Sequence, residues 1–162
     1  MDPADTPADT LADECAKTAA GLTVPALLHR NATEFADLPA LTTLGRDDTR
    51  TWAELRAEVT ELSCGLAEIG LEPGHRMLIM MSSRPEHWLV DLAAVHLGAV
   101  PSTIYPTLSA DQMRYLALHS GAQVLVLEGA AELARWRAIL PELPQLRRVV
   151  LVNGTEPGDG DP

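Results

Sequence analysis

The segment Ser83–Glu128, SRPEHWLVDLAAVHLGAVPSTIYPTLSADQMRYLALHSGAQVLVLE, decides the fold because helix-like and strand-like patterns alternate along it. Each helical pattern follows a Ser with Glu or Gln three residues later, the spacing of a capping box, and each stops at a glycine. The short apolar runs AVPSTIY and AQVLVLE follow the two helices. Such alternation is typical of a parallel sheet that is covered by helices on both faces.

The alternation continues on both sides of this segment. A third capping box, Thr51 to Glu54, opens a helix upstream, and a helix from about Ala130 to Leu140 follows downstream. Before all of these, residues 40–51 read as a hairpin. The sequence therefore predicts an α/β fold, a doubly wound parallel sheet with flanking helices, preceded by a β-hairpin. The predicted parallel strands are Met77–Met81, Val100–Tyr105, Val124–Leu127 and Val149–Val152.

Packing positions can also be predicted from the helical spacing. The helix after Thr51 carries an apolar stripe, which predicts one buried face. Each tryptophan falls on an apolar helix face, so packing is its expected role. The stripe residues are Leu55, Val59, Leu62, Leu66 and Ile69, and the tryptophans are Trp52, Trp88 and Trp136.

Three regions are predicted along the chain. Residues 1–17, rich in Asp, Ala and Pro, form an acidic mobile arm that turns helical near its end. Residues 18–152 form the α/β subdomain, which is of the size of one domain. Residues 153–162, NGTEPGDGDP, read as a Gly/Pro-rich linker or truncated loop.

Composition narrows the classes of partner and location. The net charge is −11, and eight of the 23 acidic residues lie in the first 14 and last seven positions. Nucleic acid is an unsuitable ligand, because binding it needs clustered positive charge. Cys15 and Cys64 form no metal or redox motif and are expected to be buried or bystander thiols. No secretory or membrane-spanning pattern is present, so a cytoplasmic protein without a transmembrane segment is expected.

A search for chemistry finds no reactive constellation. The turn Ser82–Pro85, where a dinucleotide fold needs glycines, has none, and Ser83 is better explained as a helix cap than as a nucleophile. Tyr105–Thr107 is more simply a turn than a ligand site, and Arg147 and Arg148 are more simply solvated charges than an anion site. No two histidines have the i, i+4 spacing of metal ligands; these are His29, His75, His87, His96 and His119. We therefore expect no catalytic, cofactor-binding or metal-binding residue in this chain, whose sole lysine is Lys17.

Residues Thr51–Glu128, TWAELRAEVTELSCGLAEIGLEPGHRMLIMM followed by SSRPEHW and the rest of the opening segment, resemble a known family. The stretch is similar to the N-terminal subdomain of the AMP-forming acyl-CoA synthetases, a superfamily that includes adenylation domains and luciferases. The motifs IYPTLS and HSGA resemble most the long-chain fatty-acid–CoA ligases. The resemblance extends over residues 22–152, with Ser82-Ser83 and Cys64 as mild departures from the family pattern.

This resemblance implies an incomplete N-terminal subdomain of the acyl-CoA synthetase fold. The family reaction uses ATP, Mg²⁺ and CoA to convert a fatty acid to an acyl-adenylate and then to a thioester. The family's phosphate loop, ribose-binding Asp and catalytic lysine lie downstream of the matched region, so no catalytic residue is carried over. The chain alone is therefore expected to be inactive, as the N-terminal fragment of a long-chain fatty-acid–CoA ligase.

Two other interpretations stay open at this point. The chain could be a stand-alone non-catalytic module that pairs with a partner chain, or a fragment of an adenylation domain that acts on another carboxylic acid. The expected partners are accordingly the remaining subdomains of the enzyme or a partner chain, with oligomerisation and peripheral membrane association of the complete enzyme left open.

Overall fold

The computed structural model describes residues 8–154, which build a four-stranded parallel sheet between two layers of helices. The strands are β3 (Arg76–Met80), β4 (Val100–Thr103), β5 (Val124–Leu127) and β6 (Arg148–Leu151), in the order β4-β3-β5-β6. All three pairings are parallel. The predicted doubly wound sheet is therefore confirmed, and each strand lies within two residues of its predicted bounds.

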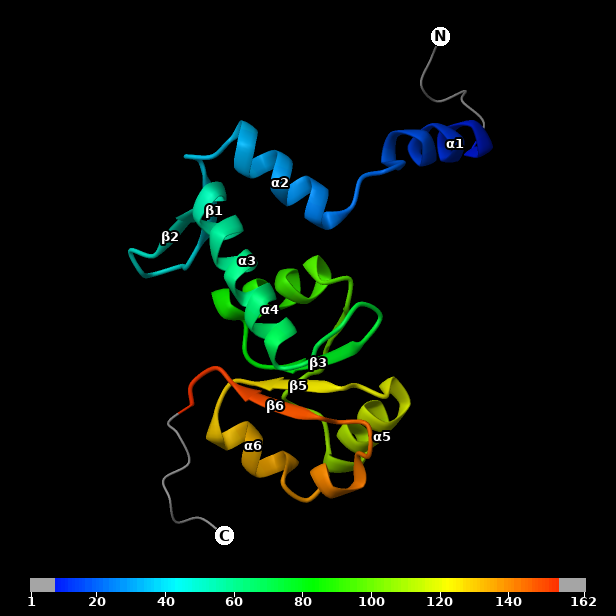
Figure 1. The fold of residues 1–162 in the computed structure, drawn as a ribbon, viewed down its shortest axis with the longest axis vertical. Helices are drawn as coiled ribbons and strands as arrows, with labels where there is room; N and C mark the ends of the chain where they lie inside the picture. Colours follow the sequence, from blue (N-terminus) through cyan, green and yellow to red (C-terminus); the bar gives the residue numbers. More distant parts are fainter. Residues whose placement is uncertain (1–7, 155–162) are drawn as a thin grey trace.

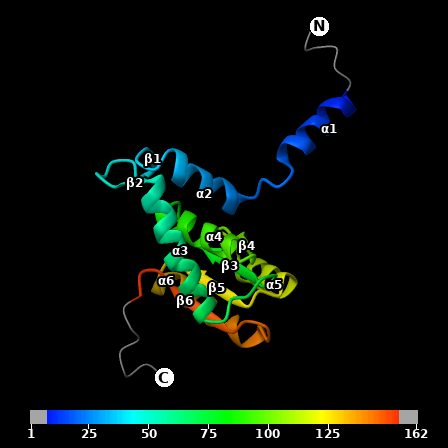
Figure 2. The same ribbon diagram turned by 45° about the horizontal axis from the view of Figure 1, so that its top comes forward.

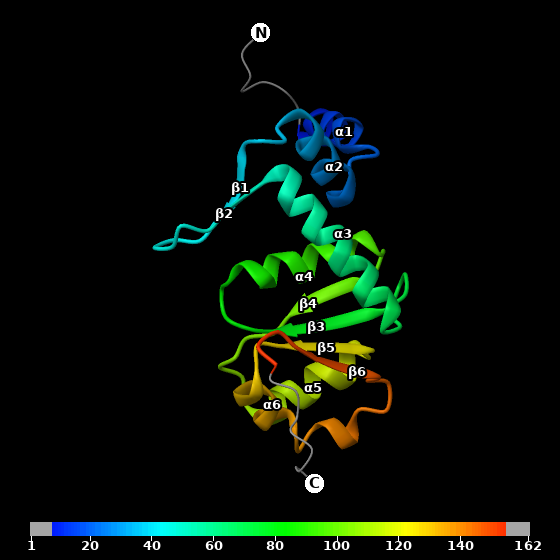
Figure 3. The same cartoon turned by 60° about the vertical axis from the view of Figure 1, so that its left-hand side comes forward.

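The helices cover the sheet from both sides (Figures 1 and 3). Two helices, α3 (Trp52–Glu68) and α4 (Pro85–His96), lie on one face. On the other face lie α5 (Ala110–Ser120) and α6 (Ala130–Trp136). The chain adds β4 on one side of β3 and then β5 and β6 on the other, so the direction of winding reverses between β3 and β5.

The N-terminal elements lie outside the sheet. The helix α1 (Ala8–Ala19) projects away from the body, and α2 (Val24–Glu34) lies above α3 and α4 (Figures 1 and 2). The predicted hairpin is present as β1 (Pro39–Thr42) and β2 (Thr49–Thr51), which pair antiparallel. Residues 1–7 of the predicted arm and residues 155–162 of the predicted linker lie outside the described residues. The boundaries of the three predicted regions stay predictions.

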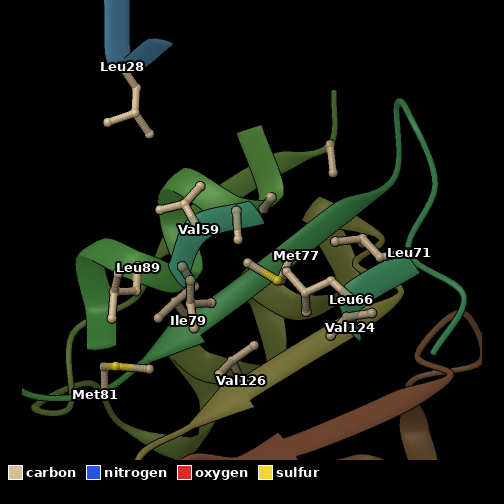
Figure 4. Packing of buried hydrophobic residues seen from close by; sticks show 14 of the residues in the cluster. Leu28, Val59, Leu66, Leu71, Met77, Ile79, Met81, Leu89, Val124 and Val126 are labelled. Atoms are coloured by element: carbon tan, nitrogen blue, oxygen red, sulfur yellow. The ribbon is translucent and has the colours of Figure 1, made fainter. Parts of the chain in front are cut away.

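The first core layer lies between the sheet and the α3–α4 pair (Figure 4). Met77 and Ile79 of β3 point into this layer, and both are fully buried. They pack with Val59 of α3 and Ala93 of α4, which are fully buried as well. Because side chains alternate along a strand, the neighbouring residues of β3 serve the opposite layer.

The second core layer lies between the sheet and the α5–α6 pair. It contains Leu78 and Met80 of β3 and Leu125 of β5. Trp136, at the end of α6, is fully buried among them, and its indole N–H donates to the sulfur of Met80 at 3.1 Å. Strands β3 and β5 are therefore buried on both faces, which explains their continuous apolar sequence.

The outer strand β4 contains a proline. Backbone N–H groups of Val100 and Ile104 donate to carbonyls of His75 and Ile79, at 2.8 Å and 2.9 Å. The intervening residue Pro101 follows Val100, so its backbone nitrogen lies on the outer side of the strand. Proline has no N–H, and sheets tolerate it at such an edge position.

Two of the three predicted capping boxes are confirmed. Thr51 and Ser109 each accept the N–H of the residue three places on, and the Glu54 and Gln112 side chains accept the cap N–H in return. The third prediction, for Ser83, is wrong, because Arg84 occupies the N-cap position of α4 and no side chain caps this helix. The acid that Ser83 would need, Glu86, instead accepts a hydrogen bond from the Arg84 side chain.

The predicted apolar stripe of α3 fails at Leu62, which is 37% exposed. The neighbouring Ser63 is buried instead, with its hydroxyl 2.8 Å from the Val59 carbonyl and 3.0 Å from the Ala93 carbonyl. That contact joins α3 to α4. Trp88 does not pack in the core as its place on an apolar helix face predicts, because this side chain is 58% exposed.

Two features bear on location and redox chemistry. Cys15 and Cys64 are exposed and free. Between residues 8 and 154, no helix combines the length and the apolar character that crossing a bilayer requires.

Candidate functional site

The carboxyl ends of β3, β5 and β6 border a polar cavity of about 530 Å³. One wall comes from the turn of the hairpin, including Arg46 and Asp48, and the other from the turn Ser82–Glu86 after β3. Glu128 and Asn153, which follow β5 and β6, complete it. Open α/β sheets commonly bind ligands at this edge, where the winding direction reverses.

Arg84 is the centre of this cavity. Its Nε donates to Glu86 Oε2 at 2.7 Å, and its Nη1 lies 3.3 Å from Glu128 Oε1. Its Nη2 donates to Asn153 Oδ1 at 3.3 Å. One guanidinium therefore links the turn after β3 to the ends of β5 and β6, which suits the fixed fork of five donors that arginine carries.

The two carboxylates in contact with Arg84 are held in their charged form. Glu128 accepts the Ser82 backbone N–H at 2.7 Å, and this bond, with the Arg84 charge, lowers the pKa of Glu128. The hydrogen bond from Arg84 lowers the pKa of Glu86 to about 2. Arg84 in turn has a raised pKa because of Glu86. The cluster of Arg84, Glu86 and Glu128 thus carries two negative charges and one positive charge. Its charged side chains contact mainly one another.

The Glu86–Arg84 pair predicts a pH dependence of stability. Glu86 has a depressed pKa in the folded state, so its contribution is complete above about pH 4.5, its ordinary pKa, and is lost as pH falls toward 2. Its side chain is 38% exposed, so solvent screening reduces the contribution to about 0.5–1 kcal/mol. We expect Glu86→Gln to lower the free energy of unfolding by that amount at pH 6 and by clearly less at pH 2.5, in urea titrations. The exposed Glu61→Gln is the control, and an equal loss at both pH values would contradict the assignment.

The residues weighed as candidates in the sequence do not come together as a site. The turn after β4 is held by Arg135, whose guanidinium donates to the carbonyls of Pro106 and Leu108, so a structural turn is the better reading there. Arg148 donates to the carbonyl of Arg147 at 2.9 Å, and both are exposed. Only Ser82 and Ser83 reach the polar cavity.

The histidines have separate surroundings. His87 Nε2 lies 2.9 Å from the Thr103 hydroxyl, and His96 Nδ1 lies 2.7 Å from the Leu92 carbonyl. Within residues 8–154, no group of three side chains has the arrangement of a metal site. Burial raises the pKa of Asp91, one turn after His87, which is a consequence of its packing on α4.

Sequence reasoning missed the residues that build the cavity. The available signal was position, because polar residues lie within four positions after the strands β3, β5 and β6. These residues are Arg84, Glu128 and Asn153. Their meeting depends on the strand order, which places β5 beside both β3 and β6.

Comparison with known proteins agrees with this architecture. The family model described as "AMP-binding enzyme" matches residues 28–162. The uncharacterised protein Rv1549 of Mycobacterium tuberculosis is 35% identical over 100 residues, which cover 62% of this chain and 57% of that protein. The long-chain-fatty-acid–CoA ligase heimdall of Drosophila melanogaster is 28% identical over 138 residues, 82% of this chain and 20% of the ligase. The chain thus spans between a fifth and somewhat over half of these relatives.

Solved structures share the fold. A protein described as a putative long-chain-fatty-acid CoA ligase from Rhodopseudomonas palustris superimposes with a TM-score of 0.76 at 23% identity, over 84% of this chain and 34% of that one. The fatty acyl CoA synthetase of Mycobacterium tuberculosis gives 0.73 at 23% identity, over 78% and 26%. The chain therefore belongs to the AMP-binding enzyme family and corresponds to the N-terminal part of the AMP-forming acyl-CoA synthetase fold.

Proposed function

We propose that this chain acts as the N-terminal scaffold of a long-chain fatty-acid–CoA ligase. The observation that carries the proposal is its similarity, over 82% of its length, to a long-chain-fatty-acid–CoA ligase of which it covers only 20%. In such an enzyme the sheet and its two helix layers would support the segments that bind the nucleotide and the acid. The partners of the chain are then the remaining subdomains of the enzyme or a partner chain, and its location is cytoplasmic.

The reaction of the complete enzyme has two steps. The carboxylate attacks the α-phosphorus of ATP and releases pyrophosphate, and the CoA thiol then attacks the acyl carbon and releases AMP. The first step needs positive charge to stabilise the phosphoryl transition state. ATP, Mg²⁺ and CoA are therefore the cofactors of the complete reaction.

The polar cavity of this chain does not fit Mg²⁺–ATP. Glu86 and Glu128 are engaged by Arg84 and the Ser82 N–H, and the third carboxylate, Asp48, is paired with Arg50 at 2.9 Å, so none is a free oxygen ligand. The lining holds two arginines, Arg46 and Arg84, against three carboxylates, so the net charge of the cavity is negative. We accordingly assign no catalytic step to the cavity. Its role in this proposal is to hold the three strand ends in register for the segments that pack there.

An exchange assay tests this division of labour. We expect the purified chain to give no fatty-acid-dependent exchange of radiolabelled pyrophosphate into ATP, because its sequence has no phosphate loop and its sole lysine is Lys17. A full-length long-chain fatty-acid–CoA ligase in the same assay is the positive control. Carboxylate-dependent exchange by the purified chain that survives Lys17→Ala would refute the scaffold role.

A second candidate is an adenylation domain that acts on another acid. Triostin synthetase I of Streptomyces triostinicus is 30% identical over 148 residues, which cover 90% of this chain and 28% of that protein. Profiling the acids that a complete enzyme carrying this subdomain activates separates the two: long-chain fatty acids favour the ligase, and amino or aryl acids favour the adenylation domain.

A further inference from the structure

A second cavity, of about 380 Å³, lies on the outer side of the α3–α4 layer. Four elements form its walls: α2, β1, the first turn of α3, and α4 through Trp88 and Leu92. Its lining includes the buried side chains of Leu28 and Leu55 and the two indoles of Trp52 and Trp88. The small side chain of Ala40 on β1 leaves this space open.

The lining is apolar except for one residue. Asn31 of α2 is the single polar residue among the ten that line the cavity. Its Oδ1 accepts a hydrogen bond from Nη2 of Arg30, which is not a lining residue, at 3.3 Å. Water fills about 30 Å³ per molecule, so roughly a dozen waters would occupy this space with few protein partners. Replacing poorly bonded water by an apolar group is favourable.

The size of the cavity limits what it can accept. One turn of α-helix, ~5 Å long and ~10 Å wide without its longer side chains, already occupies roughly 400 Å³. A helix from a partner protein therefore does not fit inside, whereas pockets for small ligands begin at about 300 Å³ and are mostly apolar with a few polar groups.

We propose that this cavity binds the hydrocarbon part of a small amphiphile, with the polar end of the ligand at Asn31. Leu28 and Leu55 form apolar contacts with the hydrocarbon part of the ligand, and the half-exposed Trp88 borders the entrance of the cavity. The site is separate from the polar cavity around Arg84, and it does not depend on the ligase proposal.

The three tryptophans allow a test with a built-in control. Trp52 and Trp88 line the cavity, whereas Trp136 is buried on the opposite face of the sheet. In a ¹H–¹⁵N spectrum, titration with 1-octanol should shift the indole signals of Trp52 and Trp88 saturably and leave that of Trp136 in place. Ala40→Ile fills the space with a side chain that suits a strand and should weaken octanol binding about tenfold.

Two further variants complete the design. Ala131→Ile, at an exposed position on α6, is the matched control and should bind octanol as the unmodified chain does. If Ala40→Ile disturbs the hairpin, Leu27→Phe fills the same cavity from α2 and should have the same effect. Equal shifts of all three indoles, absence of any shift, or unchanged binding by both filling variants would overturn the proposal. Shifts of Trp52 and Trp88 that follow protein concentration without octanol would overturn it in favour of self-association through this face.

Discussion

Replacing Trp136 by alanine should lower the free energy of unfolding by about 3–5 kcal/mol, the usual cost of removing a large aromatic from a core. The side chain is 0% exposed and packs between α6 and the sheet, against residues such as Leu125. The substitution leaves a cavity that the surrounding strands cannot close, because β3 and β5 are fixed by pairing on both sides. It also removes the indole donor to the Met80 sulfur.

Trp88→Ala is the matched control for this substitution. The Trp88 side chain is 58% exposed, so its truncation should cost about 1 kcal/mol or less. Urea unfolding followed by far-ultraviolet circular dichroism measures both variants without depending on tryptophan fluorescence. If the two losses were similar, the second core layer would not be packed as the structure describes it.

Enlarging Ala93 to leucine should destabilise the chain by about 1–3 kcal/mol, since overpacking forces side chains out of their preferred rotamers. Ala93 is fully buried where α4 faces α3. Its carbonyl also lies 3.0 Å from the Ser63 hydroxyl, so the two helices are held close at this point. An added isobutyl group must separate the helices or distort that contact.

The control for Ala93→Leu is Ala57→Leu, on the exposed side of α3. Leucine is nearly as good a helix former as alanine, so the control should change the free energy of unfolding by less than about 0.5 kcal/mol. A thermal or urea titration of both variants is sufficient. An Ala93→Leu variant as stable as the control would show that the α3–α4 contact has room that the structure does not give it.

The two central strands, β3 and β5, could be predicted from the sequence because they are buried on both faces. Val124–Leu127 is fully apolar and was predicted with the bounds that the structure has. The caps at Thr51 and Ser109 were predictable because each depends on two side chains within one short segment. In both cases the residues that cause the structure lie within the segment that forms it.

The errors arose where distant residues compete with the local pattern. Ser83 loses its capping role because the Arg84 side chain, drawn toward Glu128 and Asn153 as well, engages Glu86. Ser63 is buried in place of Leu62 because a carbonyl of α4 offers its hydroxyl a partner. The polar cavity was unpredictable for a related reason, because its residues are distant in sequence, Arg84 and Asn153 by 69 positions, and meet only through the fold.

The proline in β4 gives the sheet two chemically unequal borders. A strand approaching β4 finds no donor at Pro101, whereas β6 offers the outward N–H groups of Val149 and Leu151, since Arg148 and Val152 donate to β5. A further strand can therefore form more backbone hydrogen bonds at the β6 edge of the sheet than at the β4 edge. The same asymmetry protects the β4 border against edge-to-edge aggregation, the hazard that an unpaired strand brings to any chain at high concentration.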